Sequence, residues 1–146
     1  MLQFGDPVPG LDHVYRPAVF GLVERGGRLA CVRVERGEAS YLDLPGGAID
    51  GDETEVQALV REFVEETGLT IEPIDRIGEA AQRFRKSEGE PVNNVGGFWT
   101  ARIVAEDPSA KCEDDHTLVW LDPVDVVAGL RHEAHAWAVM RWLRSR

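Results

Sequence analysis

The chain has 146 residues, 43% of them hydrophobic and 29% charged, which suits one globular domain with a core of ordinary size. We therefore expect residues 1–146 to form a single domain. The 16 basic and 26 acidic side chains give a net charge of −10, which argues against a protein that grips nucleic acid through a broad basic face. The N-terminus lacks the pattern of a signal peptide, and no segment approaches the ~20 apolar residues of a membrane span. We expect a cytoplasmic protein that binds neither nucleic acid nor membranes.

The first predicted element is a β-hairpin within residues 18–34. Two β-rich runs flank Gly26-Gly27, which is a two-residue signature of a tight turn. A short strand, "YLDL", follows at residues 41–44. The chain then turns, because the next three residues interrupt a strand or permit unusual dihedral angles: Pro45, Gly46 and Gly47.

The most regular pattern predicts a helix from about Glu53 to Thr67. Gly68 supplies a stop, and Asp52 with Glu55 approximates a capping box at the start. The apolar residues of the segment recur at helical spacing: Val56, Leu59, Val60 and Phe63.

The second half alternates strands with one more helix. Residues 69–85 predict one or two strands, residues 95–106 another, and residues 117–121 a short one. The last helix, within residues 131–146, starts near His132 and His135, which we expect at the surface. These elements predict an α/β or α+β sandwich with helices on both faces of a central mixed sheet. The last helix should present one apolar side, made of Ala134, Trp137, Ala138 and Leu143.

Two cysteines, Cys31 and Cys112, lie far apart and outside any Cys-x-x-Cys or Cys/His pattern. The sequence therefore indicates neither a disulfide scaffold nor a zinc site. Both residues are interpreted as ordinary thiols.

Three glutamates, Glu62, Glu65 and Glu66, share one face of the predicted helix. At 100° per residue, Glu66 lies about 40° to one side of Glu62 and Glu65 about 60° to the other. Like charges at this spacing destabilise a helix by a few tenths of a kcal/mol each. Hard cations such as Mg²⁺ or Mn²⁺ take carboxylate oxygens and would neutralise the cluster. The alternative is a solvated acidic helix face.

The whole string around these glutamates resembles the signature of MutT-like Nudix hydrolases. Gly47, five residues, Glu53, seven residues and then "REFVEETGL" at residues 61–69 match that signature at every defined position. The hairpin before it, "LPGG" leading into it and "VWLDPVDV" after it are also similar to the family. The resemblance implies a Nudix-like α/β/α sandwich with a central mixed sheet, and hydrolysis of a nucleoside diphosphate linked to another moiety.

The resemblance also implies roles for single residues. Glu62, Glu65 and Glu66 would ligate Mg²⁺ or Mn²⁺, with the carbonyl of Gly46 or Gly47 as a further ligand. Glu53 would pair with Arg61 and orient these ligands. Eight residues of helix rise about 12 Å, so Glu53 must then lie in a loop that folds back.

Relatives often supply a further carboxylate from a loop after this segment. Asp115 is the best match, with Glu113 and Asp114 as alternatives. Either Glu62 or Asp115 could be the base that activates water. The residue types do not choose between them.

Substrate contacts are expected from residues 81–102, which hold the densest basic and aromatic cluster. Arg83, Arg85 and Trp99 are the candidates, with Phe84 and Lys86 in the same segment, and they could meet phosphate and a stacked base. The alternative is a solvated loop and a Trp99 that faces the core. The markers of ADP-ribose, dinucleoside polyphosphate and NADH hydrolases are mostly absent, so no specific nucleotide is indicated. A catalytically silent nucleotide sensor is the alternative function, and a homodimer is possible because dimers are common among relatives.

Overall fold

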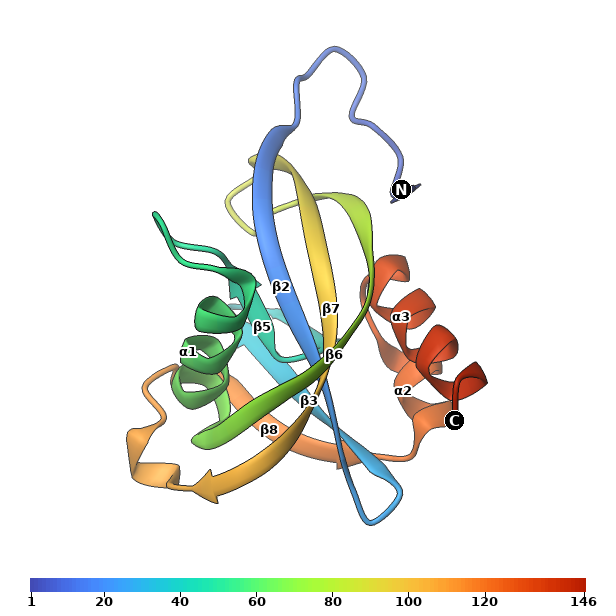
Figure 1. Cartoon of the computed structure of the whole chain (residues 1–146). Helices are drawn as coiled ribbons and strands as arrows, with labels where there is room; N and C mark the ends of the chain where they lie inside the picture. Colours follow the sequence, from blue (N-terminus) through green and yellow to red (C-terminus); the bar gives the residue numbers. More distant parts are fainter.

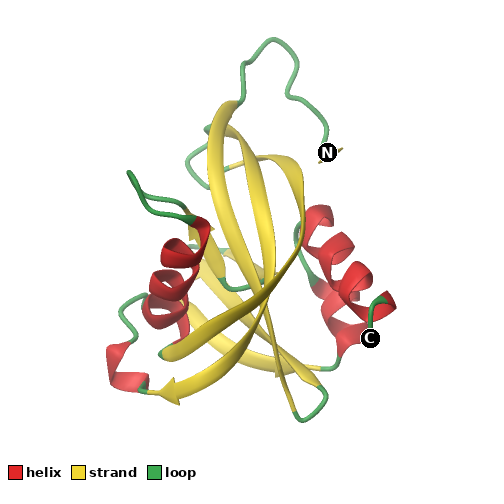
Figure 2. Cartoon of the chain, viewed as in Figure 1, coloured by secondary structure: helices red, strands yellow, loops and turns green.

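The computed structural model describes residues 1–146 and has helices on both sides of a mixed β-sheet (Figure 1, Figure 2). Its longest strands are β2 (Val14–Arg25), β6 (Leu69–Arg85) and β7 (Pro91–Glu106). β7 pairs antiparallel with β6 and parallel with β2, while β1 (Leu2–Phe4) extends the sheet parallel to β6. This mixed sheet with its covering helices confirms the predicted α+β sandwich.

The predicted hairpin is confirmed. β2 and β3 (Arg28–Arg36) are joined by Gly26 and Gly27, whose φ angles of 61° and 80° are those that a two-residue primed turn requires. The two strands pair only next to this turn, and β3 then pairs with β4 (Ala39–Asp43) and β8 (His116–Leu121). The inner part of β2 instead pairs with β5 (Gly46–Ala48).

Helix α1 (Glu55–Thr67) covers one face of the sheet and begins two residues later than predicted. Its capping box is formed by Thr54 and Gln57, so the prediction of Asp52 and Glu55 is wrong. The Glu55 carboxylate is held elsewhere by side chains of the sheet, which leaves the helix start to Thr54. Gly68 ends the helix in the left-handed region, with φ of 75°, as expected.

Helices α2 (Pro123–Gly129) and α3 (Glu133–Arg144) lie on the opposite side from α1 (Figure 2). α2, the short 3-10 turn Pro108–Ala110, β1 and β5 were not predicted as elements. Two apolar clusters fill the layers, one beneath α1 and one beneath α2 and α3. The predicted apolar side of α3 packs into the second cluster. None of the helices combines the length and apolar character needed to cross a membrane.

The prediction that His132 and His135 lie at the surface is wrong. Their exposed fractions are 4% and 2%, because the start of α3 docks onto the sheet. The His135 ring lies 4.3 Å from the Phe20 ring, and the His132 ring lies 4.6 Å from that of Phe84. Burial lowers the pKa of both histidines to about 3, so both are neutral near pH 7.

Candidate active site

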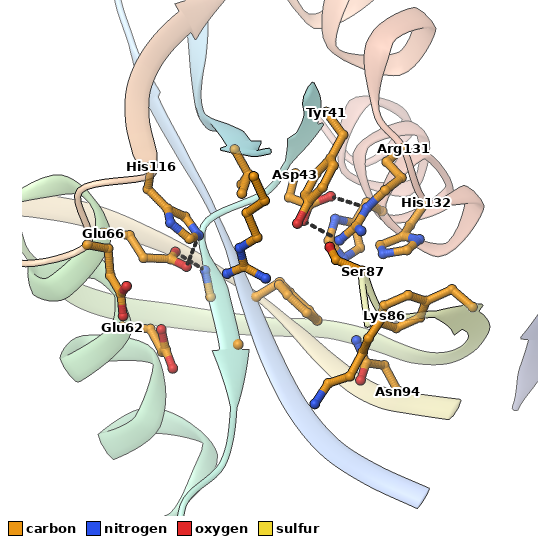
Figure 3. A pocket seen from close by; sticks show the side chains of 18 of the residues that line it. Tyr41, Asp43, Glu62, Glu66, Lys86, Ser87, Asn94, His116, Arg131 and His132 are labelled. Carbon is orange, nitrogen blue, oxygen red and sulfur yellow. Dashed lines mark hydrogen bonds and ion pairs between the residues drawn. The ribbon is translucent and has the colours of Figure 1, made fainter. Parts of the chain in front are cut away.

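A cavity of about 270 Å³ opens between the C-terminal half of α1 and the start of α3 (Figure 3). Glu62, Glu66 and His116 line one side of it, and Lys86 and Asn94 line the other (Figure 3). The cavity therefore places acidic groups opposite basic and amide groups. The lining also includes further polar and aromatic side chains, among them Arg16, Arg36, Tyr41, Asp43, Phe84, Arg131, His132 and His135.

Arg61 organises the acidic side, and its predicted pairing with Glu53 is present. Arg61 donates to both carboxylate oxygens of Glu53, each at 2.8 Å. Glu53 precedes the helix in a loop, as the pairing requires, and accepts a further bond from the Asp50 amide. These bonds, the one from Arg61 first, lower the pKa of Glu53 to about 2.

The same guanidinium reaches two of the three clustered glutamates. Arg61 Nη1 lies 3.1 Å from Glu62 Oε1 and 3.2 Å from Glu65 Oε2, and Nη2 donates to the Ala48 carbonyl. Glu65 does not line the cavity, and its carboxylate is paired with Arg61. Arg61 thus ties α1 to β5 and partly neutralises the cluster.

Glu66 is the most buried of the three, with 5% of its surface exposed. Its Oε1 accepts from the Gly46 amide at 2.9 Å, and its Oε2 lies 3.1 Å from His116 Nε2. Burial raises the pKa of Glu66, and the two hydrogen bonds oppose this. The carboxylate is fixed in orientation between β5 and β8.

Glu62 lies against the backbone of Gly47. A Cβ atom at that glycine would come within 2.9 Å of the Glu62 carboxyl carbon, so any larger residue there would require the Glu62 carboxylate to shift. Burial, and then the charge of Glu66, raise the pKa of Glu62 to about 7. A divalent cation would relieve both effects, because a positive charge favours the ionised form of each carboxylate. The clustered glutamate oxygens therefore suit a hard cation such as Mg²⁺.

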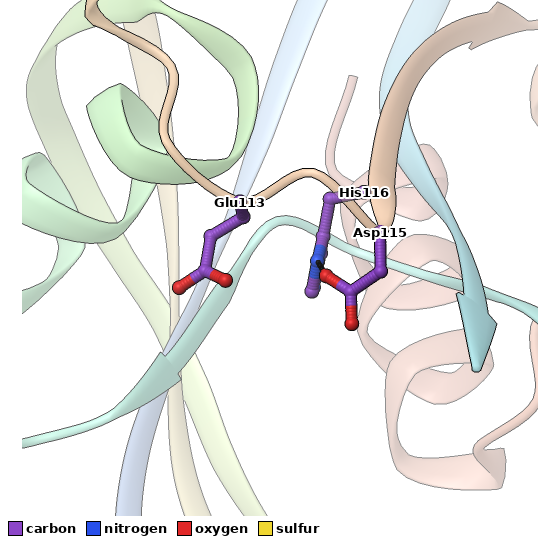
Figure 4. A group of neighbouring side chains, drawn as sticks. All are labelled: Glu113, Asp115 and His116. Carbon is purple, nitrogen blue, oxygen red and sulfur yellow. Dashed lines mark hydrogen bonds and ion pairs between the residues drawn. The ribbon is translucent and has the colours of Figure 1, made fainter.

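Asp115 lies behind His116 and not in the cavity lining. It accepts from Arg36 Nε at 2.8 Å and lies 2.7 Å from His116 Nδ1, and these bonds, Arg36 first, lower its pKa. Glu113, Asp115 and His116 form a compact group whose ligand atoms lie within 4.8 Å of one another (Figure 4). His116 was not predicted from the sequence. Its two carboxylate neighbours help raise its pKa to about 9, although burial, the largest effect, acts in the opposite direction.

The candidates for substrate contact separate into two groups. Trp99 donates to Glu55 at 2.8 Å and packs beneath α1, and Arg83 reaches the Gly5 carbonyl at 3.5 Å. Neither they nor Arg85 line the cavity, whereas Phe84 and Lys86 do. Successive residues of a strand point to opposite faces, so the arginines of this segment point away when Phe84 points inward.

The far end of the cavity contains residues that sequence reasoning missed. Arg131 lies 3.6 Å above the Tyr41 ring and 5.2 Å from the Phe84 ring, and it forms two hydrogen bonds to Asp43, at 2.8 and 3.3 Å. This end is therefore aromatic and polar together. No local pattern in the sequence connects these residues, because they come from three distant elements.

The NUDIX domain family model matches residues 14–143. The fold resembles a NUDIX hydrolase from Nitrosomonas europaea, with a TM-score of 0.76, 21% identity and 89% of each chain covered. It also resembles the MutT protein from Methanosarcina mazei Go1, with a TM-score of 0.70, 23% identity, and 93% of this chain and 98% of that chain covered. Comparison with curated proteins gives no match. Because the family model spans most of the chain, and because Gly47, Glu62 and Glu66 of the signature line a cavity, the protein belongs to the NUDIX domain family of hydrolases.

Proposed function

We propose that the protein is a divalent-metal-dependent pyrophosphohydrolase that cleaves the diphosphate linkage of a nucleoside diphosphate joined to another moiety. The observation that carries this proposal is the cavity itself, where the Glu62 and Glu66 carboxylates face Lys86 and Asn94. A diphosphate needs cations on one side and hydrogen-bond donors on the other. Two structural neighbours are an ADP-ribose pyrophosphatase from Streptococcus suis, at 14% identity, and a UDP-X diphosphatase, at 12%, and both names agree with a diphosphate substrate.

We assign Mg²⁺ or Mn²⁺ binding to Glu62, Glu65, Glu66 and the carbonyl of Gly47. When bound, such an ion neutralises diphosphate charge and lowers the pKa of a coordinated water. The raised pKa values of Glu62 and Glu66 support the assignment, because they mark carboxylates that lack a sufficient counter-charge. Arg61 holds Glu62 and Glu65 in place, and Glu53 holds Arg61.

We assign the role of proton acceptor to Glu62 in preference to Asp115. Glu62 lines the cavity, where a water that attacks the substrate would lie, whereas Asp115 does not. Asp115 is engaged by Arg36 and His116, and its lowered pKa makes it a weaker base. Asp115 would instead orient His116, which in turn holds Glu66.

We infer that Phe84 and Lys86, together with Tyr41 and Arg131, contact the substrate. Their position in the cavity lining supports this, with the aromatic rings suited to a nucleoside and the cations to phosphate. Arg83, Arg85 and Trp99 lie outside that lining.

The test is to incubate the protein with a panel of phosphate-anhydride compounds and Mg²⁺ or Mn²⁺, and to detect the products by chromatography. The panel contains ADP-ribose, sugar nucleotides, nucleoside triphosphates, oxidised nucleotides and dinucleoside polyphosphates. We expect Glu65→Gln and Glu66→Gln to lower kcat by about 100-fold or more, because several kcal/mol of transition-state stabilisation depend on the metal. Glu72→Gln, an exposed glutamate paired with Arg102 on the sheet, is the matched control and should keep full activity.

Turnover of a compound that EDTA and both variants abolish would support the proposal and name the substrate. Equal activity in wild type and Glu66→Gln would contradict the metal assignment. Failure to hydrolyse any compound, with a melting temperature that still rises on nucleotide binding, would favour the sensor alternative.

A further inference from the structure

Arg16 is the one cation of the cavity that has no carboxylate partner. No carboxylate oxygen lies within 4.0 Å of its side-chain nitrogens, although the residue is half-buried. Its only hydrogen bond is to the side chain of Asn94. The other cations of the lining each face a carboxylate, in the pairs Arg36 with Asp115, Arg131 with Asp43, and Lys86 with Glu88 and Glu90.

Arg16 and Asn94 are direct neighbours on the parallel strands β2 and β7. Arg16 Nη1 donates to Asn94 Oδ1 at 3.0 Å, which fixes both side chains. A guanidinium carries five N–H donors, so most of those of Arg16 remain free. Asn94 is only 6% exposed, and its amide N–H groups have no partner in the protein. The pair therefore presents unused donors from a nearly buried position.

Asn94 faces the cavity on the side opposite the glutamates, and Arg16, to which it is hydrogen-bonded, also lines the cavity. Asn94 and Lys86 lie across from Glu62 and Glu66 (Figure 3). Burial lowers the pKa of Arg16, and the charge of Glu62 opposes this only in part, so the guanidinium would gain from an additional anion. A planar guanidinium binds phosphate oxygens in a bidentate manner, which Arg16 is free to do.

We propose that Arg16 and Asn94 form an anion subsite that binds a phosphate group of the substrate across the cavity from Glu66. The identity of the anion rests on the proposed function. A substrate that reaches both the glutamates and this subsite must carry at least two linked phosphates. With a volume of about 270 Å³, the cavity lies at the small end of small-molecule sites, which favours a compact substrate.

Inorganic pyrophosphate is the probe, because its binding can be measured without hydrolysis of a nucleotide. Isothermal titration calorimetry would be run on the full chain in EDTA and again with Ca²⁺. We expect Arg16→Gln to weaken pyrophosphate binding at least about tenfold with Ca²⁺, since a hydrogen bond to a charged group contributes at least that factor. Asn94→Asp should weaken it similarly with Arg16 intact, because the new carboxylate pairs with the guanidinium.

Arg85→Gln is the matched control. It removes the same charge from an exposed arginine that does not line the cavity, and it should bind pyrophosphate within twofold of wild type. If Arg16→Gln binds as tightly as wild type, or if wild type binds no pyrophosphate in either buffer, the subsite is refuted. If Asn94→Asp does not fold, Arg16→Gln decides the question alone.

The outcomes also separate this inference from the proposed function. If pyrophosphate binding depends on Arg16 but the protein hydrolyses no compound of the panel, the subsite is supported and the proposed enzyme activity is refuted. If Arg16→Gln hydrolyses the substrate with an unchanged KM and binds pyrophosphate as wild type does, the enzyme activity is supported and the subsite is refuted.

Discussion

Arg61 is the internal counter-ion of the carboxylate cluster, since its one guanidinium contacts Glu53, Glu62 and Glu65. Removal of this cation leaves three neighbouring carboxylates without a common partner. We expect Arg61→Met to lower the free energy of unfolding by about 1–2 kcal/mol in EDTA, because charged hydrogen bonds contribute this much at a partly exposed site. Urea denaturation followed by circular dichroism measures the change.

The same variant tests whether the cluster binds a cation. Saturating Mg²⁺ should raise the melting temperature of Arg61→Met by more than that of wild type, because the variant gains the counter-charge that it lost. Arg76→Met is the control, since Arg76 bridges Glu55 and Glu79 outside the cavity. An equal Mg²⁺ shift in all three proteins would show that Arg61 does not balance the metal-binding carboxylates.

The start of α1 shows how two overlapping capping patterns compete. Both Asp52 with Glu55 and Thr54 with Gln57 have the spacing of a capping box, and the structure uses the second. Glu53 is drawn into the preceding loop by Arg61, and Glu55 is held by Arg76 and Trp99. The sequence pattern thus predicted the helix but not its first residue, because that residue depends on contacts with distant strands.

The stability of variants at the two candidate N-cap residues shows which of them caps α1. Thr54→Ala should destabilise the protein by about 1 kcal/mol, the usual cost of removing an N-cap side chain. Asp52→Ala should change stability by much less, because the exposed Asp52 side chain makes no hydrogen bond in the structure. Equal losses in the two variants, determined by urea denaturation, would contradict the assignment of Thr54 as the cap.

The irregular strand β6 is the reason why the sequence did not predict which side chains of residues 81–86 face the cavity. The sequence could not decide between one and two strands over residues 69–85, and the structure has one strand with three register shifts against β7. Each shift changes which residues face the cavity, since side chains alternate between the two faces. The basic and aromatic composition singled out this segment for substrate contact, and the structure places Phe84 and Lys86 of it in the cavity lining.

At the scale of the whole molecule, the two walls of the cavity differ in how predictable they were. The glutamates of the acidic wall come from one contiguous segment, residues 47–69, whose spacing could be recognised in the sequence. The rest of the lining is assembled from Arg16, Asn94, Arg131 and others that only the folded chain brings together. His132 and His135 also line the cavity. Their burial was missed because a histidine is more often polar surface than core, although Ala134, Ala136 and Trp137 flank His135.

These buried histidines should control the acid stability of the fold. Each has a pKa of about 3 in the folded protein and 6.5 as its ordinary value, so the unfolded chain binds more protons between these limits. Stability therefore falls as the pH drops below 6.5, by up to about 1.4 kcal/mol per pH unit for each histidine. Glu62, with its pKa raised to about 7, acts in the opposite direction from pH 7 down to about 4.5. His116, with its pKa raised to about 9, stays protonated in both states below pH 6.5 and adds little slope there.

The two histidines lower the stability of the metal-free protein as the pH falls from 6.5 to 5, while Glu62 and Glu66, whose pKa values are raised, oppose this fall. His135→Asn removes one of the two, while its amide oxygen can still accept from the Leu44 amide in place of Nδ1. We expect the free energy of unfolding of this variant to fall less steeply than that of wild type across that range, by up to about 1.4 kcal/mol per pH unit, because one of the two titrating histidines is gone. The measurement is a set of urea denaturation curves in EDTA at several pH values. If His135→Asn shows the same acid slope as wild type, protonation of His135 in the unfolded chain is not what destabilises the protein.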